Sequence, residues 1–146
     1  MKPTIFIDAD GCPVVDITTR IASDNKIDCI IICDTSHEFE KPGAKTITVD
    51  KGTDSVDFRL VNMLRENDIV VTQDYGLAAM CLAKKAIPIN QDGMIYSDKN
   101  IDELLHSRYI AKKIRNAGGR LPGPHKREAL QDESFKITFK KLIKES

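Results

Sequence analysis

Short apolar runs alternate along the chain with longer segments whose apolar residues recur at helical spacing. The runs at Thr4–Asp8, Ile27–Cys33 and Asp68–Asp74 are too short for helices, so we predict buried strands there. Residues Lys45–Asp50 alternate weakly between apolar and polar, and residues 87–90 form a short Ile-Pro-Ile-Asn run, which predicts two more strands. Continuous apolar strands of this kind are typical of parallel sheets that are covered on both faces.

Helices are predicted between these strands and after the last of them. The predicted ranges are 13–25 with Pro13 in the first turn, 54–64, 75–86, 100–117 and 128–145. In the last of these helices one apolar side is expected to hold Leu130, Phe135, Phe139, Leu142 and Ile143. Strands that alternate with helices predict an α/β fold, a three-layer sandwich with a mainly parallel, Rossmann-like central sheet of about four to five strands.

Length and charge bear on organisation and partners. A chain of 146 residues predicts a single domain, residues 1–146, with a basic helical extension from about residue 118. Residues 1–107 carry 11 Lys and Arg against 18 Asp and Glu, a net charge of −7, whereas residues 108–146 carry 11 against 4, a net charge of +7. Either the two parts pair with each other and with solvent, or the basic part meets a polyanion such as nucleic acid.

Cellular location and cysteine chemistry follow from what the sequence lacks. There is no apolar run of membrane-spanning length and no charged-then-apolar leader, so we expect a cytoplasmic protein. Four cysteines are present and none forms a Cys-x-x-Cys pair. We therefore expect small buried hydrophobic side chains in a reducing compartment, in preference to a metal or disulfide site.

Acidic residues gather where the predicted strands end. Asp8 ends the first strand and Asp10 follows it, while Asp74 ends the strand that reads Val-Val-Thr-Gln-Asp. The third strand leads through Lys51 and Gly52 to Asp54 and Asp57. Because sites in parallel α/β sheets lie outside the carboxyl ends of the strands, we expect these carboxylates to share one edge of the sheet.

Asp57 occupies an unusual position on its predicted helix. At about 100° per residue, an apolar stripe is formed by Val56, Leu60, Val61 and Leu64. Asp57 falls inside that stripe, where a carboxylate is costly unless a partner such as a metal ion compensates it. The alternative is helix capping, with Asp54 as the N-cap and Asp57 beside the positive end of the helix dipole.

A cluster of carboxylates without His or Cys suits a hard cation, Mg²⁺ or Mn²⁺. Such ions commonly bind phosphate oxygens and orient an attacking water. The candidate ligands are Asp8, Asp10, Asp54, Asp57 and Asp74. Of these, Asp8, Asp10, Asp57 and Asp74 are the candidate catalytic residues.

Two families share parts of this pattern. The segment IFIDADG (Ile5–Gly11) resembles the opening motif of haloacid-dehalogenase phosphatases, in which the first Asp is a nucleophile and the second a general acid. That motif normally continues with Thr or Val, whereas Cys12 and Pro13 follow here. The Lys and the acidic pair that this family needs later have no convincing counterpart, although Val-Thr-Gln-Asp could mimic the Thr of its second motif.

The closer resemblance is to the YaiI/YqxD family of bacterial proteins, which is grouped with PIN-like (PilT N-terminus) nuclease domains. Its motifs match here as DADGCPV (Asp8–Val14), GTDSVD (Gly52–Asp57), VTQD (Val71–Asp74) and GGRLPGP (Gly118–Pro124). They occur in order and span almost the whole chain. The resemblance implies a PIN-like fold and a metal-dependent nuclease that acts on RNA.

Residue roles can be carried over from that resemblance. It implies that Asp8, Asp57 (or Asp54) and Asp74 bind a divalent metal ion for hydrolysis of an RNA phosphodiester by an activated water. A fourth acidic ligand has no sure counterpart, and Asp10 or Asp92 could serve.

Other residues are candidates for contacts with nucleic acid. Thr72 is expected at the acidic edge, where it could bond a carboxylate or a phosphate. Arg120, Lys126 and Arg127 flank the Gly/Pro-rich stretch and are candidate phosphate contacts. Two alternatives to a ribonuclease stay open, a phosphatase with Asp8 as nucleophile and a nucleic-acid-binding module without catalysis.

Overall fold

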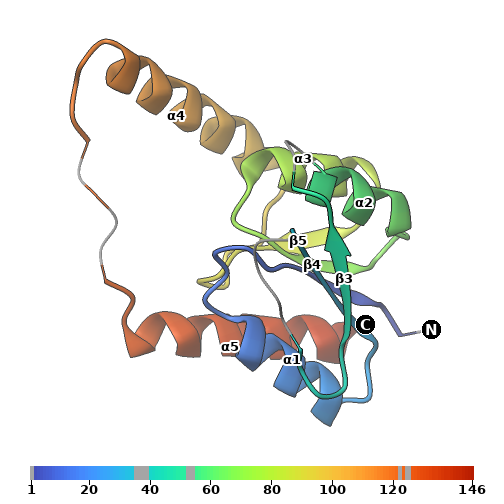
Figure 1. Ribbon diagram of the computed structural model, residues 1–146. Coiled ribbons are helices and arrows are strands. Elements are labelled where there is room, and N and C mark those ends of the chain that lie inside the picture. Colours follow the sequence, from blue (N-terminus) through green and yellow to red (C-terminus); the bar gives the residue numbers. More distant parts are fainter. Residues whose placement is uncertain (1, 35–39, 52–54, 122, 124–125) are drawn as a thin grey trace.

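The computed structural model describes residues 2–34, 40–51, 55–121, 123 and 126–146. Its centre is one sheet of five parallel strands in the order β3-β2-β1-β4-β5 (Figure 1). The strands are β1 (Ile5–Asp8), β2 (Cys29–Asp34), β3 (Lys45–Val49), β4 (Ile69–Val71) and β5 (Ile87–Ile89). The predicted α/β class, parallel sheet and strand number are confirmed.

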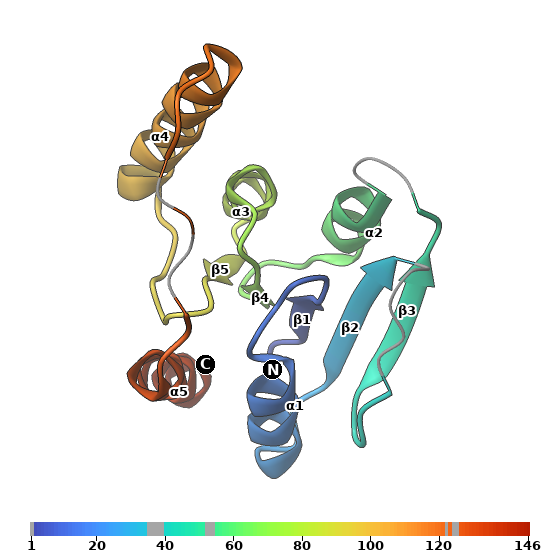
Figure 2. The ribbon, with the colours of Figure 1, turned by 60° about the vertical axis from the view of Figure 1, so that its left-hand side comes forward.

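Helices cover both faces of the sheet and complete a three-layer sandwich (Figure 2). On one face lie α1 (Val15–Asp24) and α5 (Ala129–Glu145), and on the other lie α2 (Ser55–Met63) and α3 (Tyr75–Ala83). The long helix α4 (Asp98–Asn116) packs on α3 at its beginning and then projects away from the body. None of the helices in the described ranges is both long enough and apolar enough to cross a membrane.

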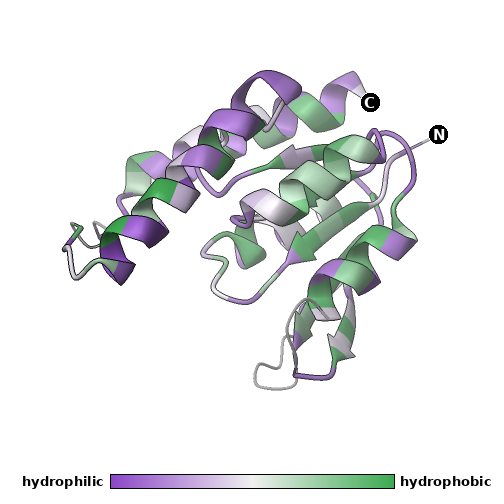
Figure 3. Cartoon of the chain, turned by 90° about the horizontal axis from the view of Figure 1, so that it is seen from above, coloured by the Kyte–Doolittle hydropathy of each residue, from purple (hydrophilic) through white to green (hydrophobic). Residues whose placement is uncertain are grey.

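Successive residues of β1 point to opposite faces of the sheet. Ile5 and Ile7 belong to the core beneath α1 and α5, whereas Phe6 belongs to the core beneath α2 and α3. Since side chains alternate along a strand, Asp8 points to the same face as Phe6, the face that α2 and α3 cover. Hydrophobic colouring accordingly dominates the strands in Figure 3, while the helices carry both colours.

The last helix belongs to the main core. Phe135 and Phe139 of α5 are fully buried and stacked, with ring centroids 5.2 Å apart, and Leu142 is buried beside them. Leu130 was predicted on the same apolar side, and this prediction is wrong because its exposed fraction is 76%. It lies five residues before Phe135, about 140° around the helix from the buried side.

Two predicted helix boundaries also need correction. Pro13 precedes α1, which begins at Val15 after the N-cap Val14, so Pro13 is not in the first turn. The third predicted helix ends earlier than residue 86 because Lys84 is its C-cap and Lys85 has a φ of 61°. A left-handed backbone conformation cannot continue an α-helix.

Candidate active site

Four of the predicted acidic residues line one hollow at the carboxyl ends of the strands. The hollow has a volume of about 430 Å³. Its described lining consists of Asp8, Asp10, Val56, Asp57, Gln73, Asp74, Tyr75 and Arg108. Carboxylates from β1, from the turn after it, from α2 and from the start of α3 therefore meet, although up to 66 residues separate Asp8 from Asp74 in the sequence.

The turn between β1 and α1 is held by hydrogen bonds to its neighbours. A carboxylate oxygen of Asp10, Oδ2, accepts from the backbone N–H of Asp34 at 3.0 Å, which ties this turn to the end of β2. Gly11 follows with a φ of +74°, a conformation in which glycine is favoured. The side-chain amide of Gln73 donates to the Gly11 carbonyl at 2.8 Å, so the loop after β4 fixes the same turn.

Thr72 positions Asp8. Its hydroxyl donates to Asp8 Oδ2 at 2.8 Å and accepts from the backbone N–H of Asp74 at 3.0 Å. The Tyr96 hydroxyl donates to the Thr72 carbonyl at 3.1 Å. Thr72 is only 1% exposed, so of the two roles predicted for it the structure shows the bond to a carboxylate. The side chain lies behind Asp8, away from solvent.

Asp74 caps the helix that begins beside the pocket. Its Oδ1 accepts from the backbone N–H groups of Gly76 at 2.8 Å and Leu77 at 3.1 Å. A Cβ atom at position 76 would lie 3.3 Å from that oxygen, so glycine allows the carboxylate to approach closely. The guanidinium of Arg108 on α4 lies 3.8 Å from the same oxygen. Asp74 is thus both a structural cap and a wall of the pocket.

Burial makes the carboxyl group of Asp8 a weaker acid than an ordinary Asp. Desolvation raises the pKa of its carboxyl group, the Thr72 hydrogen bond opposes this, and the charges of Asp74 and Asp10 raise it further, to about 6. The neighbouring Cys12 thiol has its pKa raised to about 11, chiefly by burial, and is neutral at physiological pH. The charge of Asp8 therefore changes close to neutral pH.

Asp57 faces the pocket from the first turn of α2. Its side chain is half-buried, and Val56 and Leu60 of the predicted apolar stripe pack into the core beneath this helix. Asp57 therefore lies at the border between that core and the pocket. Asp54, the other acidic candidate in this motif, lies outside the described residues.

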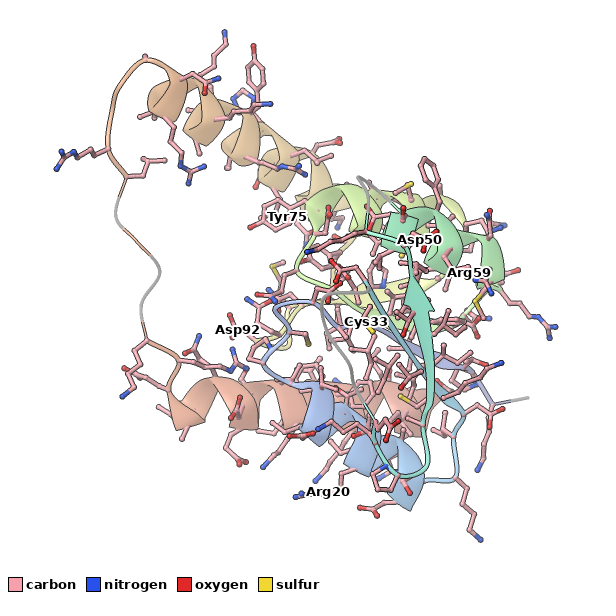
Figure 4. The ribbon with its side chains drawn as sticks, in the orientation of Figure 1. Arg20, Cys33, Asp50, Arg59, Tyr75 and Asp92 are labelled. Atoms are coloured by element: carbon pink, nitrogen blue, oxygen red, sulfur yellow. The ribbon has the colours of Figure 1, made fainter. Side chains whose placement is uncertain are left out.

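Asp92 and Arg127 lie together in a different place. Asp92 accepts from Arg127 at 2.8 Å and from Gln131 at 3.2 Å. Arg127 also donates to Asp132 at 2.7 Å and to the Gln91 carbonyl at 2.6 Å, and thereby holds the loop after β5 against the start of α5. Figure 4 shows Asp92 close to α5 and Tyr75 at the opposite layer, beneath α4. Asp92 does not line the pocket, which leaves Asp10 as the fourth carboxylate there.

The other predicted phosphate contacts are not brought to the pocket. Arg120 and Lys126 are exposed in the connection between α4 and α5, and neither lines the hollow. Arg108 does line it, although it was absent from the predicted site. A signal for Arg108 exists in the sequence, since it follows Ile101 and Leu104 at helical spacing and so continues the inward side of α4.

The donor chemistry of the pocket fits a hard divalent cation, because its four carboxylates offer only oxygen ligands. Within the described residues, however, no three His, Cys, Asp or Glu side chains are gathered as a ready-made metal site.

Comparison with known proteins places the chain in a family. Residues 6–145 match the family model described as "Uncharacterized BCR, YaiI/YqxD family". The chain belongs to this family. Its relatives include a UPF0178 protein of Exiguobacterium sibiricum, 50% identical over 97% of this chain and 96% of the relative, and one of Ruminiclostridium cellulolyticum, 52% identical over 96% and 92%. The predicted resemblance to YaiI/YqxD proteins is thereby confirmed.

Among solved structures, the family member is similar to a crystal structure of Rae1 (YacP) from Bacillus subtilis. The TM-score is 0.45, the sequence identity is 12%, and the alignment covers 99% of each chain. A likeness at this level does not bear on function.

Proposed function

We propose that this member of the YaiI/YqxD family is a divalent-metal-dependent, PIN-like nuclease that hydrolyses RNA phosphodiesters. The observation that carries the proposal is the convergence of Asp8, Asp10, Asp57 and Asp74 on one open hollow at the carboxyl ends of the strands. Three of them, Asp8, Asp57 and Asp74, are the carboxylates at which the motif resemblance implies metal-dependent phosphodiester hydrolysis, and Asp10 is one of the two candidates for the fourth ligand. The raised pKa of Asp8 supports the proposal, since burial and, to a smaller extent, the charges of Asp74 and Asp10 disfavour the ionised carboxylate, which a bound cation would stabilise.

The residues of the pocket would have different roles in the hydrolysis. Asp8, Asp10, Asp57 and Asp74 would hold the ion, and Thr72 fixes the orientation of Asp8 through its hydroxyl. A bound Mg²⁺ or Mn²⁺ supplies a water of lowered pKa and neutralises charge on the phosphate. The proposed hydrolysis is an in-line displacement by water without a covalent intermediate.

A phosphatase of the haloacid-dehalogenase type is supported less well. Thr72, which could mimic the Thr of that family's second motif, does lie beside Asp8 and donates to it. Yet Arg108 is the one cation in the described lining of the pocket, and no lysine is present there. Trapping a phosphoryl group on Asp8 would favour this alternative.

The direct test combines metal binding with RNA turnover. We expect calorimetric titration with Mn²⁺ to give saturable binding, and incubation of the loaded protein with a mixed RNA pool to shorten it. The Asp57→Asn variant should lose both effects, whereas Asp98→Asn, which removes an exposed first-turn carboxylate of α4 away from the pocket, should keep both. Metal and RNA binding without cleavage would instead indicate a binding module, and no metal binding would refute the proposal.

A further inference from the structure

The second half of α4 leaves the body of the protein. The helix is anchored at its start, where Ile101 is buried beside Ala78 and Tyr96, and Leu104 and Leu105 pack against that cluster. From residue 106 to residue 117, all side chains are exposed apart from the half-buried Ala111. Figure 1 shows this half projecting beyond α3. Except for Arg108, whose guanidinium reaches the body, about three turns of helix therefore have no packing partner within the described part of the chain.

The inward side of α4 changes from apolar to positive where the helix leaves the body. Arg108 continues the side that Ile101 and Leu104 begin, and Lys112 and Arg115 follow it at spacings of four and three residues. At 100° per residue these three cations lie within about 60° of one another, on a single stripe. Arg108 lines the acidic pocket and its guanidinium lies 3.8 Å from Asp74. The stripe thus starts at the pocket and runs outward for about 10 Å.

Arg108 pairs with Asp74, but the charges of Lys112 and Arg115 farther along the stripe are not balanced by acids close in the sequence. Residues 104–127 contain seven Lys and Arg and no Asp or Glu. Among the described residues, neither Lys112 nor Arg115 forms an ion pair, and the Lys113 ammonium lies 5.0 Å from the centroid of the Tyr109 ring. Like charges three and four residues apart disfavour a helix, and a bound polyanion would remove that repulsion.

We infer that the stripe of Arg108, Lys112 and Arg115 binds the phosphate backbone of a single-stranded nucleic acid and guides it into the acidic pocket. The inference rests on the proposed function, which makes RNA the expected strand. A row of single cations matches one backbone and not the two of a duplex, and Tyr109, 53% exposed on the adjacent side, offers a surface on which a base can stack.

The test compares two variants that each lose two positive charges. The stripe variant is Lys112→Ala/Arg115→Ala. The control is Lys140→Ala/Lys141→Ala, whose exposed lysines lie on α5 in the opposite layer. Binding of a fluorescent, unstructured RNA of about 20 nucleotides is followed by anisotropy in EDTA, so that cleavage does not interfere, over a range of salt concentrations.

We expect the stripe variant to bind more weakly, with the slope of log affinity against log salt reduced by about 1.4 for two lost contacts. Between about 50 and 200 mM salt, the wild type should then lose about sevenfold more affinity than the stripe variant. The control should follow the wild type. Equal behaviour of the two double variants, or no RNA binding by the wild type, would overturn the inference.

Parallel measurements keep this inference separate from the proposed nuclease. Cleavage in Mn²⁺ with no loss of binding in the stripe variant would refute the role of α4 and leave the nuclease standing. Loss of binding in the stripe variant, with no cleavage by the wild type, would support the role of α4 and refute the nuclease.

The exposed Ile110 and Ile114 lie on the other side of α4, and self-association through them is a competing use of this helix. A dimer in sedimentation that Ile110→Glu/Ile114→Glu dissociates, combined with unaltered RNA binding by the stripe variant, would also overturn the inference.

Discussion

Asp8 is a carboxylate at the end of a buried strand, and its neighbours only partly compensate for the hydration it loses there. The Thr72 hydroxyl favours the charged form, but burial and the charges of Asp74 and Asp10 outweigh it and raise the pKa to about 6. In the unfolded chain the pKa of this group is close to 3.8. The folded protein therefore binds a proton more tightly than the unfolded chain between these two values.

This difference predicts a stability that falls as the pH rises. Between pH 5 and about 7.5 the ionisation of Asp8 should cost the metal-free protein about 1.4 kcal/mol of unfolding free energy. The Asp8→Asn variant keeps an acceptor for Thr72 and cannot ionise, so it should escape this loss. Urea unfolding of both proteins in EDTA at the two pH values measures the effect. If the gap between wild type and variant stays constant with pH, the raised pKa is refuted.

Metal binding should depend on pH for the same reason. At pH 7.5 Asp8 is ionised and available to a cation, whereas at pH 5 a proton competes for it. We predict that millimolar Mn²⁺ raises the melting temperature at pH 7.5 and raises it less at pH 5.

The role of Asp57 is tested by the same melts. Asp57→Asn should be at least as stable as the wild type without metal and should lose the Mn²⁺ response, because a repelling ligand is gone. If Asp57 acts only on the helix dipole, the variant should instead lose up to about 1 kcal/mol and keep the response. Asp98→Asn, a first-turn carboxylate outside the pocket, provides the matched control.

Arg127 shows where residue-scale reasoning from the sequence reaches its limit. The prediction of a phosphate contact rests on its place beside the Gly/Pro-rich stretch in the basic part of the chain, and in the structure its side chain donates to Asp92, Asp132 and the Gln91 carbonyl. The sequence shows charge but not the long-range partner, here 35 residues away. Asp8, Asp57 and Asp74 were predictable because strand ends and helical spacing determine their positions, whereas Arg108 depends on how far α4 reaches over α3.

We predict that Arg127→Ala destabilises the protein by about 1–3 kcal/mol, since it removes the donor to Asp132 and to the Gln91 carbonyl and leaves Asp92 with Gln131 as its side-chain donor. Urea unfolding measures this loss. Lys126→Ala, which removes an exposed neighbouring charge, should change the free energy of unfolding by less than about 0.5 kcal/mol. Equal and small effects of the two changes would contradict the structural role of Arg127.

At the scale of elements, the apolar pattern was enough to predict the sheet but not the limits of each helix. Ile5 and Ile7 of β1 and Ile31 of β2 all lie in the core, as continuous apolar strands of a covered parallel sheet should. The error at Leu130 has a simple geometric cause, since an apolar residue at a helix start can fall outside the arc that Phe135 and Phe139 define. Helical spacing predicts the buried side of a helix only when the angle of every apolar residue around the axis is measured from one common residue.

Helix α5 is expected to contribute strongly to stability because its aromatic side chains close one of the two cores. Phe139→Ala should lower the free energy of unfolding by about 3–5 kcal/mol. Leu130→Ala, on the exposed side of the same helix, should change it by no more than about 0.5 kcal/mol. Equilibrium unfolding in urea of the two variants measures both values. Comparable losses would show that α5 does not pack as described.

At the scale of the whole molecule, the acidic part and the basic part of the chain adjoin each other at the pocket. The acidic hollow lies in the part of the chain with a net charge of −7, and Arg108, the cation at its edge, opens the part with a net charge of +7. Without a bound cation, the hollow repels the phosphates that the basic part attracts. The two proposed functions, metal binding and RNA binding, should therefore be coupled.

This coupling gives a prediction for the complete protein. In EDTA, Asp8→Asn/Asp57→Asn should bind single-stranded RNA more tightly than the wild type, by about fivefold for each carboxylate removed, because each close like-charge contact costs about 1 kcal/mol in water. Mn²⁺ should raise the affinity of the wild type and leave that of the double variant nearly unchanged. Anisotropy titrations at constant ionic strength, with non-hydrolysable RNA, measure all four affinities. If the carboxylates lie off the path of the strand, the wild type and the variant will bind equally well in EDTA, and Mn²⁺ will affect neither.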